Sequence, residues 1–98
     1  MHTTVWHYHV ASGREAEFEG YYGSDGPWVS LFRQAPGYLE TVLLRDVAHA
    51  DEYVTFDRWR SAEDYAGFHA VYRDEYARLD AAAESLTTAE RHLGTFES

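Results

Sequence analysis

The sequence predicts one α+β domain over residues 1–98, with the element order β, α, β, β, α, β. Three observations predict it: four segments rich in β-branched and aromatic residues, two longer segments with apolar residues at helical spacing, and a length of 98 residues that suits a single domain. A strand follows each helix and returns to the same sheet. We therefore expect both helices on one face of a four-stranded antiparallel sheet.

The predicted strands are bounded by turn residues and span 4–10, 38–45, 52–59 and 88–96. Alternation places Trp6 and Tyr8 on one face of the first strand and His7 and His9 on the other. Both faces of the first and third strands are partly apolar, which indicates that the face without helices is also covered. We expect a second copy to cover it, giving a homodimer through the open sheet face. A monomer with a wet aromatic face is the alternative.

The two helical segments differ in regularity. The first begins at a predicted capping box of Ser12 and Glu15, breaks at residues 23–27, and resumes until Pro36. The second begins at a capping box of Ser61 and Asp64 and is predicted to be one long helix. Its apolar stripe is the clearest periodic signal in the chain, and it contains Tyr65, Phe68, Tyr72, Tyr76, Leu79, Ala83 and Leu86.

Composition excludes several classes of partner and chemistry. The formal net charge is -9, and such a surface repels phosphate backbones and anionic lipid, so we expect neither nucleic acid nor membrane as a partner. The chain has no cysteine, which excludes disulfides and thiolate zinc sites. All eight basic residues are Arg, which excludes a lysine Schiff base. Without a signal peptide or a long apolar segment, the expected location is cytoplasmic.

Histidines on the first strand raise the question of a metal site. His7 and His9 share one face, a spacing that some metal sites use, with Asp57 or His92 as the available third ligand. The alternative is two amphipathic rings at a dimer surface. No ligand-rich motif supports the metal, and we predict none.

A polar-tipped stripe on the second helix is the main candidate for chemistry. Tyr65, His69, Tyr72 and Tyr76 are four, three and four residues apart, so they line one side of a helix. They either pack in the core with their hydroxyls reaching water, or wall a cavity in which His69 moves a proton. The Asp57-Arg58-Trp59 run also has two interpretations. It forms either an ion pair and a core indole, or a carboxylate and an indole at the mouth of the cavity.

Several segments resemble the antibiotic biosynthesis monooxygenase family of the dimeric α/β-barrel superfamily. They are Val10-Ala11-Ser12-Gly13 before a Glu-rich helix, residues 28–32 followed by Ala35-Pro36-Gly37-Tyr38, and residues 53–59 before Ser61. The Asp-Arg-Trp-x-Ser run followed by an aromatic helix containing Phe68 is the most family-like. The resemblance implies a ferredoxin-like monomer, two copies of which join their sheets into a dimeric α/β barrel.

The resemblance also implies a function. Oxygenases of this family oxidise electron-rich aromatic or polyketide-like substrates without metal, flavin or haem, in a site between sheet and helices. Matched to this chain, the catalytic residues would be His69 and Tyr72. The substrate-binding residues would be Trp6, Tyr8, Trp59, Tyr65, Phe68 and Tyr76. We therefore expect a cofactor-independent monooxygenase with a small-molecule substrate and a pocket of about 300 Å³ or more. The alternative is a non-catalytic small-molecule-binding or structural dimer module.

Overall fold

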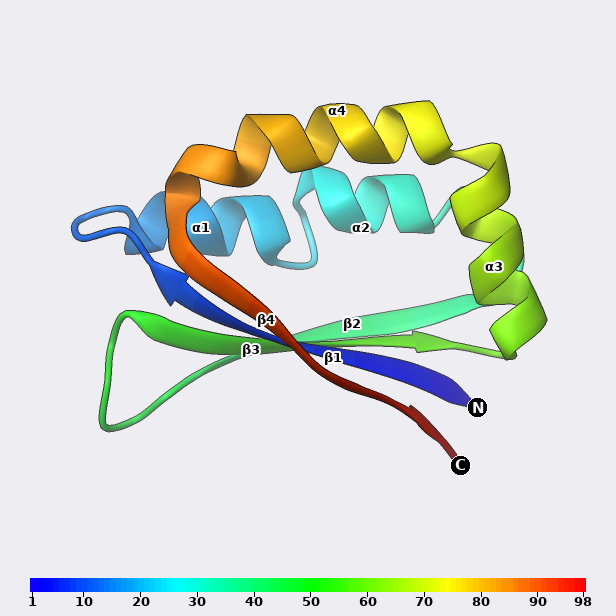
Figure 1. Ribbon diagram of the computed structural model, residues 1–98, viewed down its shortest axis with the longest axis horizontal. Coiled ribbons are helices and arrows are strands. Elements are labelled where there is room, and N and C mark those ends of the chain that lie inside the picture. Colours follow the sequence, from blue (N-terminus) through cyan, green and yellow to red (C-terminus); the bar gives the residue numbers. More distant parts are fainter.

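Four strands form an antiparallel sheet that carries every helix on one face (Figure 1). The computed structural model describes residues 1–98. In sheet order the strands are β2, β3, β1 and β4. The elements are β1 His2–Val10, α1 Glu15–Tyr22, α2 Pro27–Phe32, β2 Tyr38–Arg45, β3 Glu52–Trp59, α3 Ala62–Val71, α4 Arg73–Ala83, the short 3-10 helix η1 Glu84–Leu86 and β4 Thr87–Glu97. The predicted ferredoxin-like α+β fold is confirmed.

Short-range signals fix most element ends. Pro27 occupies the first turn of α2, where its missing N–H is tolerated. The Ser61 hydroxyl accepts the Asp64 N–H at 3.1 Å and caps α3, as predicted. Gly37 has a φ of +85°, and a Cβ at this position would lie 2.3 Å from an Asp64 oxygen, so only glycine fits between α2 and β2.

Two predictions about the helices are wrong. Ser12 does not cap α1: the chain first turns through Gly13, with a φ of +81°, and the helix begins at Glu15 without a side-chain cap. The second helix is not continuous, because it bends at Tyr72 and divides into α3 and α4 (Figure 1). No Pro or Gly marks the bend. It follows from tertiary packing, since Phe68 on α3 contacts Trp59 of the sheet while Tyr76 on α4 contacts Trp28 of α2.

Strand register decides which side chains face the helices. Tyr8 on β1 lies opposite Tyr53 on β3 and Glu90 on β4. One row further along, Trp6 lies opposite Thr55 and His92. Directly opposed residues share a sheet face, so all of these side chains lie on the side of Tyr8, whose ring packs against Phe18 of α1. The faces predicted by alternation are confirmed, and Asp57 and Trp59 are now placed on the helical side.

The core is aromatic and continuous between sheet and helices. The largest fully buried side chains are Trp59, Tyr53, Phe18 and Val10. Around them the rings meet edge to face, tilted or stacked, with centroids between 4.3 and 6.2 Å apart. None of the helices is long and apolar enough to cross a membrane.

Candidate active site

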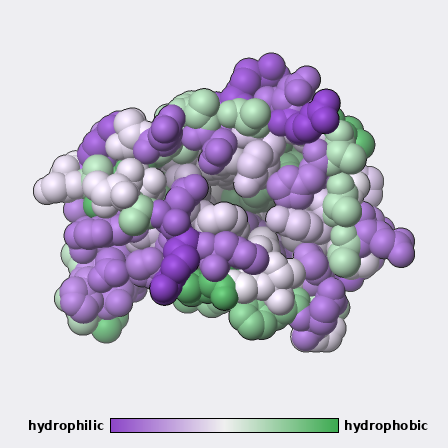
Figure 2. Space-filling view, in the orientation of Figure 1, coloured by the Kyte–Doolittle hydropathy of each residue, from purple (hydrophilic) through white to green (hydrophobic).

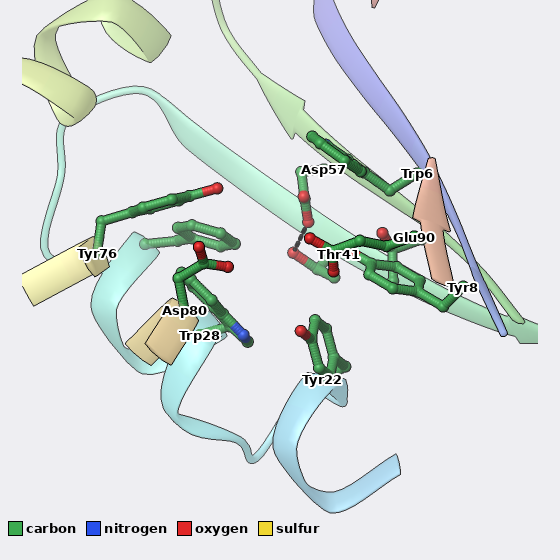
Figure 3. A pocket seen from close by; sticks show the side chains of 11 residues that line it. Trp6, Tyr8, Tyr22, Trp28, Thr41, Asp57, Tyr76, Asp80 and Glu90 are labelled. Atoms are coloured by element: carbon green, nitrogen blue, oxygen red, sulfur yellow. Dashed lines mark hydrogen bonds between the residues drawn. The ribbon is translucent and has the colours of Figure 1, made fainter. Parts of the chain in front are cut away.

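A small cavity lies between the helical layer and the middle of the sheet. Its volume is about 50 Å³, and all four strands together with α1, α2 and α4 contribute to its wall. Figure 2 shows a hollow at this level of the molecule, surrounded mainly by hydrophilic residues. Figure 3 shows the side chains that point into it. They are Trp6, Tyr8, Tyr22, Trp28, Phe32, Thr41, Thr55, Asp57, Tyr76, Asp80 and Glu90.

A wider cleft adjoins this cavity along α4 and β4. It has a volume of about 520 Å³ and shares Tyr22, Asp80 and Glu90 with the cavity. The inner cavity alone is smaller than the pocket of about 300 Å³ or more expected from the sequence, which is the size of an ordinary small-molecule site. The cavity and the cleft together provide room for one, so the three shared residues lie where a ligand would pass from cleft to cavity.

Asp57 is the titratable group at the inner wall. Its Oδ1 accepts a hydrogen bond of 2.7 Å from the Thr41 hydroxyl (Figure 3). Thr41 has one hydroxyl proton and gives it to Asp57, so its 2.7 Å contact with Tyr38 is a bond that the Tyr38 hydroxyl donates. This relay holds one carboxylate oxygen of Asp57 and leaves the other without a side-chain partner.

No cation neutralises Asp57. The neighbouring Arg58 points to the opposite sheet face, where its guanidinium lies 3.4 Å from Glu40. The run thus combines the two interpretations of the sequence: Arg58 forms an ion pair, with Glu40, and Trp59 is a core indole, whereas Asp57 is a carboxylate of the cavity. Burial raises the pKa of Asp57 to about 6, and the Thr41 hydrogen bond opposes this only in part. A carboxylate of this kind is ionised at neutral pH and accepts a proton readily.

The tyrosines of the cavity are held in the neutral form. Burial raises the pKa of Tyr8, of Tyr22 and of Tyr76, and the carboxylates of Asp57, Asp80 or Glu90 raise each further. At neutral pH these hydroxyls are therefore donors and acceptors of hydrogen bonds and not bases.

Two polar atoms of the wall have no hydrogen-bond partner. The Trp28 indole N–H belongs to a residue that is 6% exposed, and the Thr55 hydroxyl to one that is 2% exposed. Each lies near a tyrosine, Tyr22 and Tyr8 respectively, yet neither forms a hydrogen bond of adequate geometry. Because buried donors without partners are unfavourable, both are suited to bind an oxygen of a ligand.

The region under α3 is filled, in contrast to the cavity. Trp59 is 0% exposed, and its ring contacts Phe32, Tyr38, Tyr65 and Phe68. His69 lies against Tyr65 and Tyr76, with ring centroids 4.5 and 4.9 Å away, and burial lowers its pKa.

The predicted site residues thus fall into two groups. Trp6, Tyr8 and Tyr76 line the cavity. Trp59, Tyr65, Phe68 and His69 form the aromatic packing beside it, and the Tyr72 hydroxyl donates to the Gln34 carbonyl at 3.3 Å on the outside of α3. The catalytic roles of His69 and Tyr72 remain predictions. Asp80, Glu90, Tyr22 and Trp28 were missed, because no local pattern in the sequence brings α1, α2, α4 and β4 together.

The histidines of β1 pair with separate carboxylates. His7 lies 3.2 Å from Glu52, and His9 lies 2.6 Å from Asp51. The suggested third ligands are on the other sheet face, since Asp57 lines the cavity and His92 contacts Trp6. The ligand atoms of Asp46, His49 and Glu52 do lie within 4.8 Å of one another in the β2–β3 loop. Asp46 already accepts two backbone N–H groups there.

Comparison with known proteins identifies the family. The family model described as antibiotic biosynthesis monooxygenase matches residues 1–71. No curated protein matches the sequence significantly. Among solved structures, SnoaB from Streptomyces nogalater, a cofactor-independent oxygenase, is 24% identical, with a TM-score of 0.80 over 99% of this chain and 91% of that one. A SnoaB mutant gives a TM-score of 0.82 at 23% identity, with the same shares covered. PA3566 from Pseudomonas aeruginosa gives 0.71 at 15% identity, over 99% of this chain and 92% of that one.

Proposed function

Because the chain belongs to the antibiotic biosynthesis monooxygenase family, we propose that it is a cofactor-independent monooxygenase acting on a small, electron-rich phenol or enol of aromatic or polyketide-like type. The observation that carries the proposal is the Asp57 carboxylate. It lies on the wall of an aromatic cavity, has no cationic partner, and has a pKa raised to about 6. A base with these properties is suited to activating a substrate hydroxyl at neutral pH.

The reaction needs no group beyond the substrate and molecular oxygen. The free oxygen of Asp57 takes the substrate O–H proton, and the electron pair of that bond stays on the substrate as an enolate or phenolate. The anion passes one electron to O2, and the resulting radical and superoxide combine to form a carbon–oxygen bond. The peroxide anion takes back the proton from Asp57 and becomes a hydroperoxide. The carbon that carries it then loses its hydrogen together with the terminal hydroxyl as water, which leaves one oxygen atom in the product as a carbonyl. The substrate is oxidised, and O2 is reduced to that carbonyl oxygen and water.

The cavity wall supplies groups for each part of this reaction. The Thr41 hydroxyl fixes one Asp57 oxygen, which orients the other toward the ligand. The unpartnered Thr55 hydroxyl and Trp28 N–H are donors for the developing oxyanion. Trp6, Tyr8 and Tyr76 provide aromatic walls against which a flat ring packs, and they exclude water from the radical pair.

The acidity of Asp57 restricts the substrate. A simple phenol with a pKa of roughly 10 is about four units above Asp57, so deprotonation would cost about 5 kcal/mol before any oxidation. An enol of a dicarbonyl compound or a polycyclic hydroxyaromatic is more acidic and reduces that cost. We therefore propose acidic phenols and enols, and not simple phenols, as substrates.

A non-catalytic binding module is the second candidate function. The observation that favours it is the size of the inner cavity, about 50 Å³, which is below the range of ordinary ligand sites. Under this alternative Asp57 contributes to ligand affinity or folding and not to turnover, so the two candidates differ in what a substitution at Asp57 changes.

Oxygen consumption tests the proposal. Purified protein is mixed with dithranol, a naphthohydroquinone or acetylacetone, and O2 uptake is measured against the protein-free rate. We expect uptake with at least one compound, an at least 100-fold lower kcat/KM for Asp57→Asn, and an unchanged value for Asp25→Asn on an exposed loop. Uptake equal to the protein-free rate for every compound, or full activity in Asp57→Asn, would contradict the proposal.

We further propose that two copies pair through the sheet face that carries no helix. Leu44, Leu93 and Phe96 are 49%, 44% and 54% exposed, and they lie beside Val5, Val54 and Phe56 in two depressions of this face. An exposed apolar surface of this kind favours association. Sedimentation should give a dimer for the wild type and a monomer for Phe56→Glu. Val71→Glu, at a 72% exposed position on α3, should remain dimeric. A wild-type monomer would exclude the pairing.

A further inference from the structure

We propose that the ligand of the cavity carries a protonated amine, and that Asp80 and Glu90 hold this ammonium group where the cavity meets the outer cleft. The inference deepens the proposed function: it rests on that function for the reaction, whereas the binding step can be tested alone. The ligand class is an aromatic compound with a hydroxyl or enol at one end and an alkylammonium at the other.

The charge of the lining is the first argument. The lining of the cavity contains three acidic residues, Asp57, Asp80 and Glu90, and it contains no Arg or His. None of the three takes part in a salt bridge. Partial burial raises the pKa of Glu90, and the charge of the neighbouring Asp80 raises it further, as expected for two nearby carboxylates without a counter-ion. A cationic ligand would relieve this repulsion, and an anionic one would increase it.

The rings around these carboxylates are the second argument. The lining includes six aromatic side chains, and those of Tyr22 and Tyr76 lie close enough to Asp80 for its charge to raise their pKa values. Aromatic faces attract organic cations through their quadrupole. Rings combined with carboxylates therefore suit an alkylammonium better than they suit a neutral or anionic tail.

The arrangement does not suit a metal ion. The only three acidic or histidine side chains whose ligand atoms lie within 4.8 Å of one another are Asp46, His49 and Glu52, far along the β2–β3 loop. The cavity carboxylates are distributed over three elements, β3, α4 and β4, and enclose an extended space (Figure 3). A molecule with two separated polar ends fits this arrangement.

The unpartnered donors are an independent sign of a ligand. Thr55, which is 2% exposed, lies on the inner strand β3, two residues before Asp57, and its hydroxyl has no partner. Asp80 and Glu90 lie on α4 and on the edge strand β4, where the cavity opens into the cleft. The inner end therefore binds an oxygen and the outer end binds a cation. This polarity places the reacting hydroxyl at Asp57.

Three probes with the same phenol ring and different tails test the inference. They are tyramine, with an ammonium, para-ethylphenol, with a neutral tail, and para-hydroxyphenylacetate, with a carboxylate. Binding is measured at neutral pH by calorimetry. We expect tyramine to bind at least about tenfold more tightly than para-ethylphenol and the anion to bind most weakly, with the preference shrinking as salt screens the carboxylates.

Variants separate the carboxylates from the rest of the site. In the double variant Asp80→Asn with Glu90→Gln the tyramine preference should fall below about threefold, with para-ethylphenol affinity unchanged, whereas Asp25→Asn should keep it. Both changed residues are exposed, and circular dichroism checks the fold. Equal binding of the three probes, tighter binding of the anion, or no binding of any probe would overturn the inference. Tyramine preference without oxygen uptake for any aminated phenol or enol would instead overturn the proposed reaction.

Discussion

Asp57 and Trp59 occupy the same face of β3 at alternate positions, yet they lie in opposite surroundings. Trp59 is fully buried among Phe32, Tyr38, Tyr65 and Phe68. Asp57 lines a cavity and keeps a carboxylate oxygen free for a ligand. The chain thus builds a filled end and a hollow middle on one strand, and the difference shows how a small domain can maintain both stability and a site.

The composition of the cross-strand rows accounts for the difference. In the row that contains Asp57, the opposed residues are Thr41 on β2 and Thr4 on β1, which are small and polar. In the row that contains Trp59, the opposed residues include Tyr38, a large ring. Small side chains at the centre of the sheet leave space under the helices, and large ones at its end close it.

The largest expected effect is on the filled end. Trp59→Ala removes a fully buried ring and should lower the free energy of unfolding by about 3–5 kcal/mol. Trp6→Ala, on the cavity wall, should lower it by less than about 2 kcal/mol, because water from the cleft can enter the enlarged space. Urea unfolding followed by circular dichroism measures both.

A milder variant covers the case in which Trp59→Ala does not fold. Trp59→Phe keeps most ring contacts and removes the indole N–H, which has no hydrogen-bond partner. Trp59→Phe should therefore lower the free energy of unfolding much less than Trp59→Ala does. Equal losses of unfolding free energy for Trp6→Ala and Trp59→Ala would show that the filled and the hollow region do not differ in packing.

The second prediction concerns the stability cost of Asp57. Its pKa in the folded protein, about 6, is above the ordinary value of 3.8 for an aspartate, so the folded state binds more protons between these pH values than the unfolded state. Wild-type stability should fall as the pH rises through this window, by up to about 3 kcal/mol. Asp57→Asn, uncharged throughout, should be more stable than the wild type above pH 7 and should lose the proposed activity.

Asp64, a carboxylate whose pKa is lowered in the folded protein, provides the control. Arg60 and Ser61 lower the pKa of Asp64, so this group contributes stability above its unfolded pKa and loses it as the pH falls. Asp64→Asn should therefore destabilise the protein at neutral pH, where Asp57→Asn stabilises it. Unfolding curves at about pH 4 and about pH 7.5 separate the two signs. If Asp57→Asn were less stable than the wild type at neutral pH, the carboxylate would stabilise the fold, and the prediction would be wrong.

Much of the fold could be predicted because its signals are local. The hairpin strand at residues 52–59 and the cap at Ser61 follow from alternation and from one hydroxyl. The bend at Tyr72 could not be predicted, since the helical periodicity continues through it and only the packing of Tyr76 on Trp28 requires it. The failed cap at Ser12 has a local cause, the left-handed turn at Gly13, which a capping pattern does not reveal.

The candidate site could be predicted only in part. Trp6, Tyr8 and Tyr76 line the cavity, and their role in substrate binding stays a prediction. Strand alternation alone places Arg58 on the face opposite Asp57, so the absence of an ion pair between them was available from the sequence. The absence of any other cation near Asp57 could not be predicted, because it depends on where every other arginine lies in the fold. Asp80 and Glu90 meet only through the crossing of α4 over the sheet.

The smallest expected effect separates His69 and Tyr72 from Asp57. His69 packs between two tyrosine rings under the filled end, so His69→Ala should lower the free energy of unfolding by about 1 kcal/mol and change kcat/KM less than threefold. Burial lowers the pKa of His69, so the unfolded state binds its proton first and wild-type stability should decline as the pH falls below about 6.5. The difference in unfolding free energy between wild type and His69→Ala should therefore shrink in acid.

Tyr72→Phe loses one exposed hydrogen bond to Gln34 and should change neither the free energy of unfolding nor kcat/KM measurably. A 100-fold loss of kcat/KM in His69→Ala with its fold intact would move the proton transfer from Asp57 to the filled end and remove the functional distinction between the two regions.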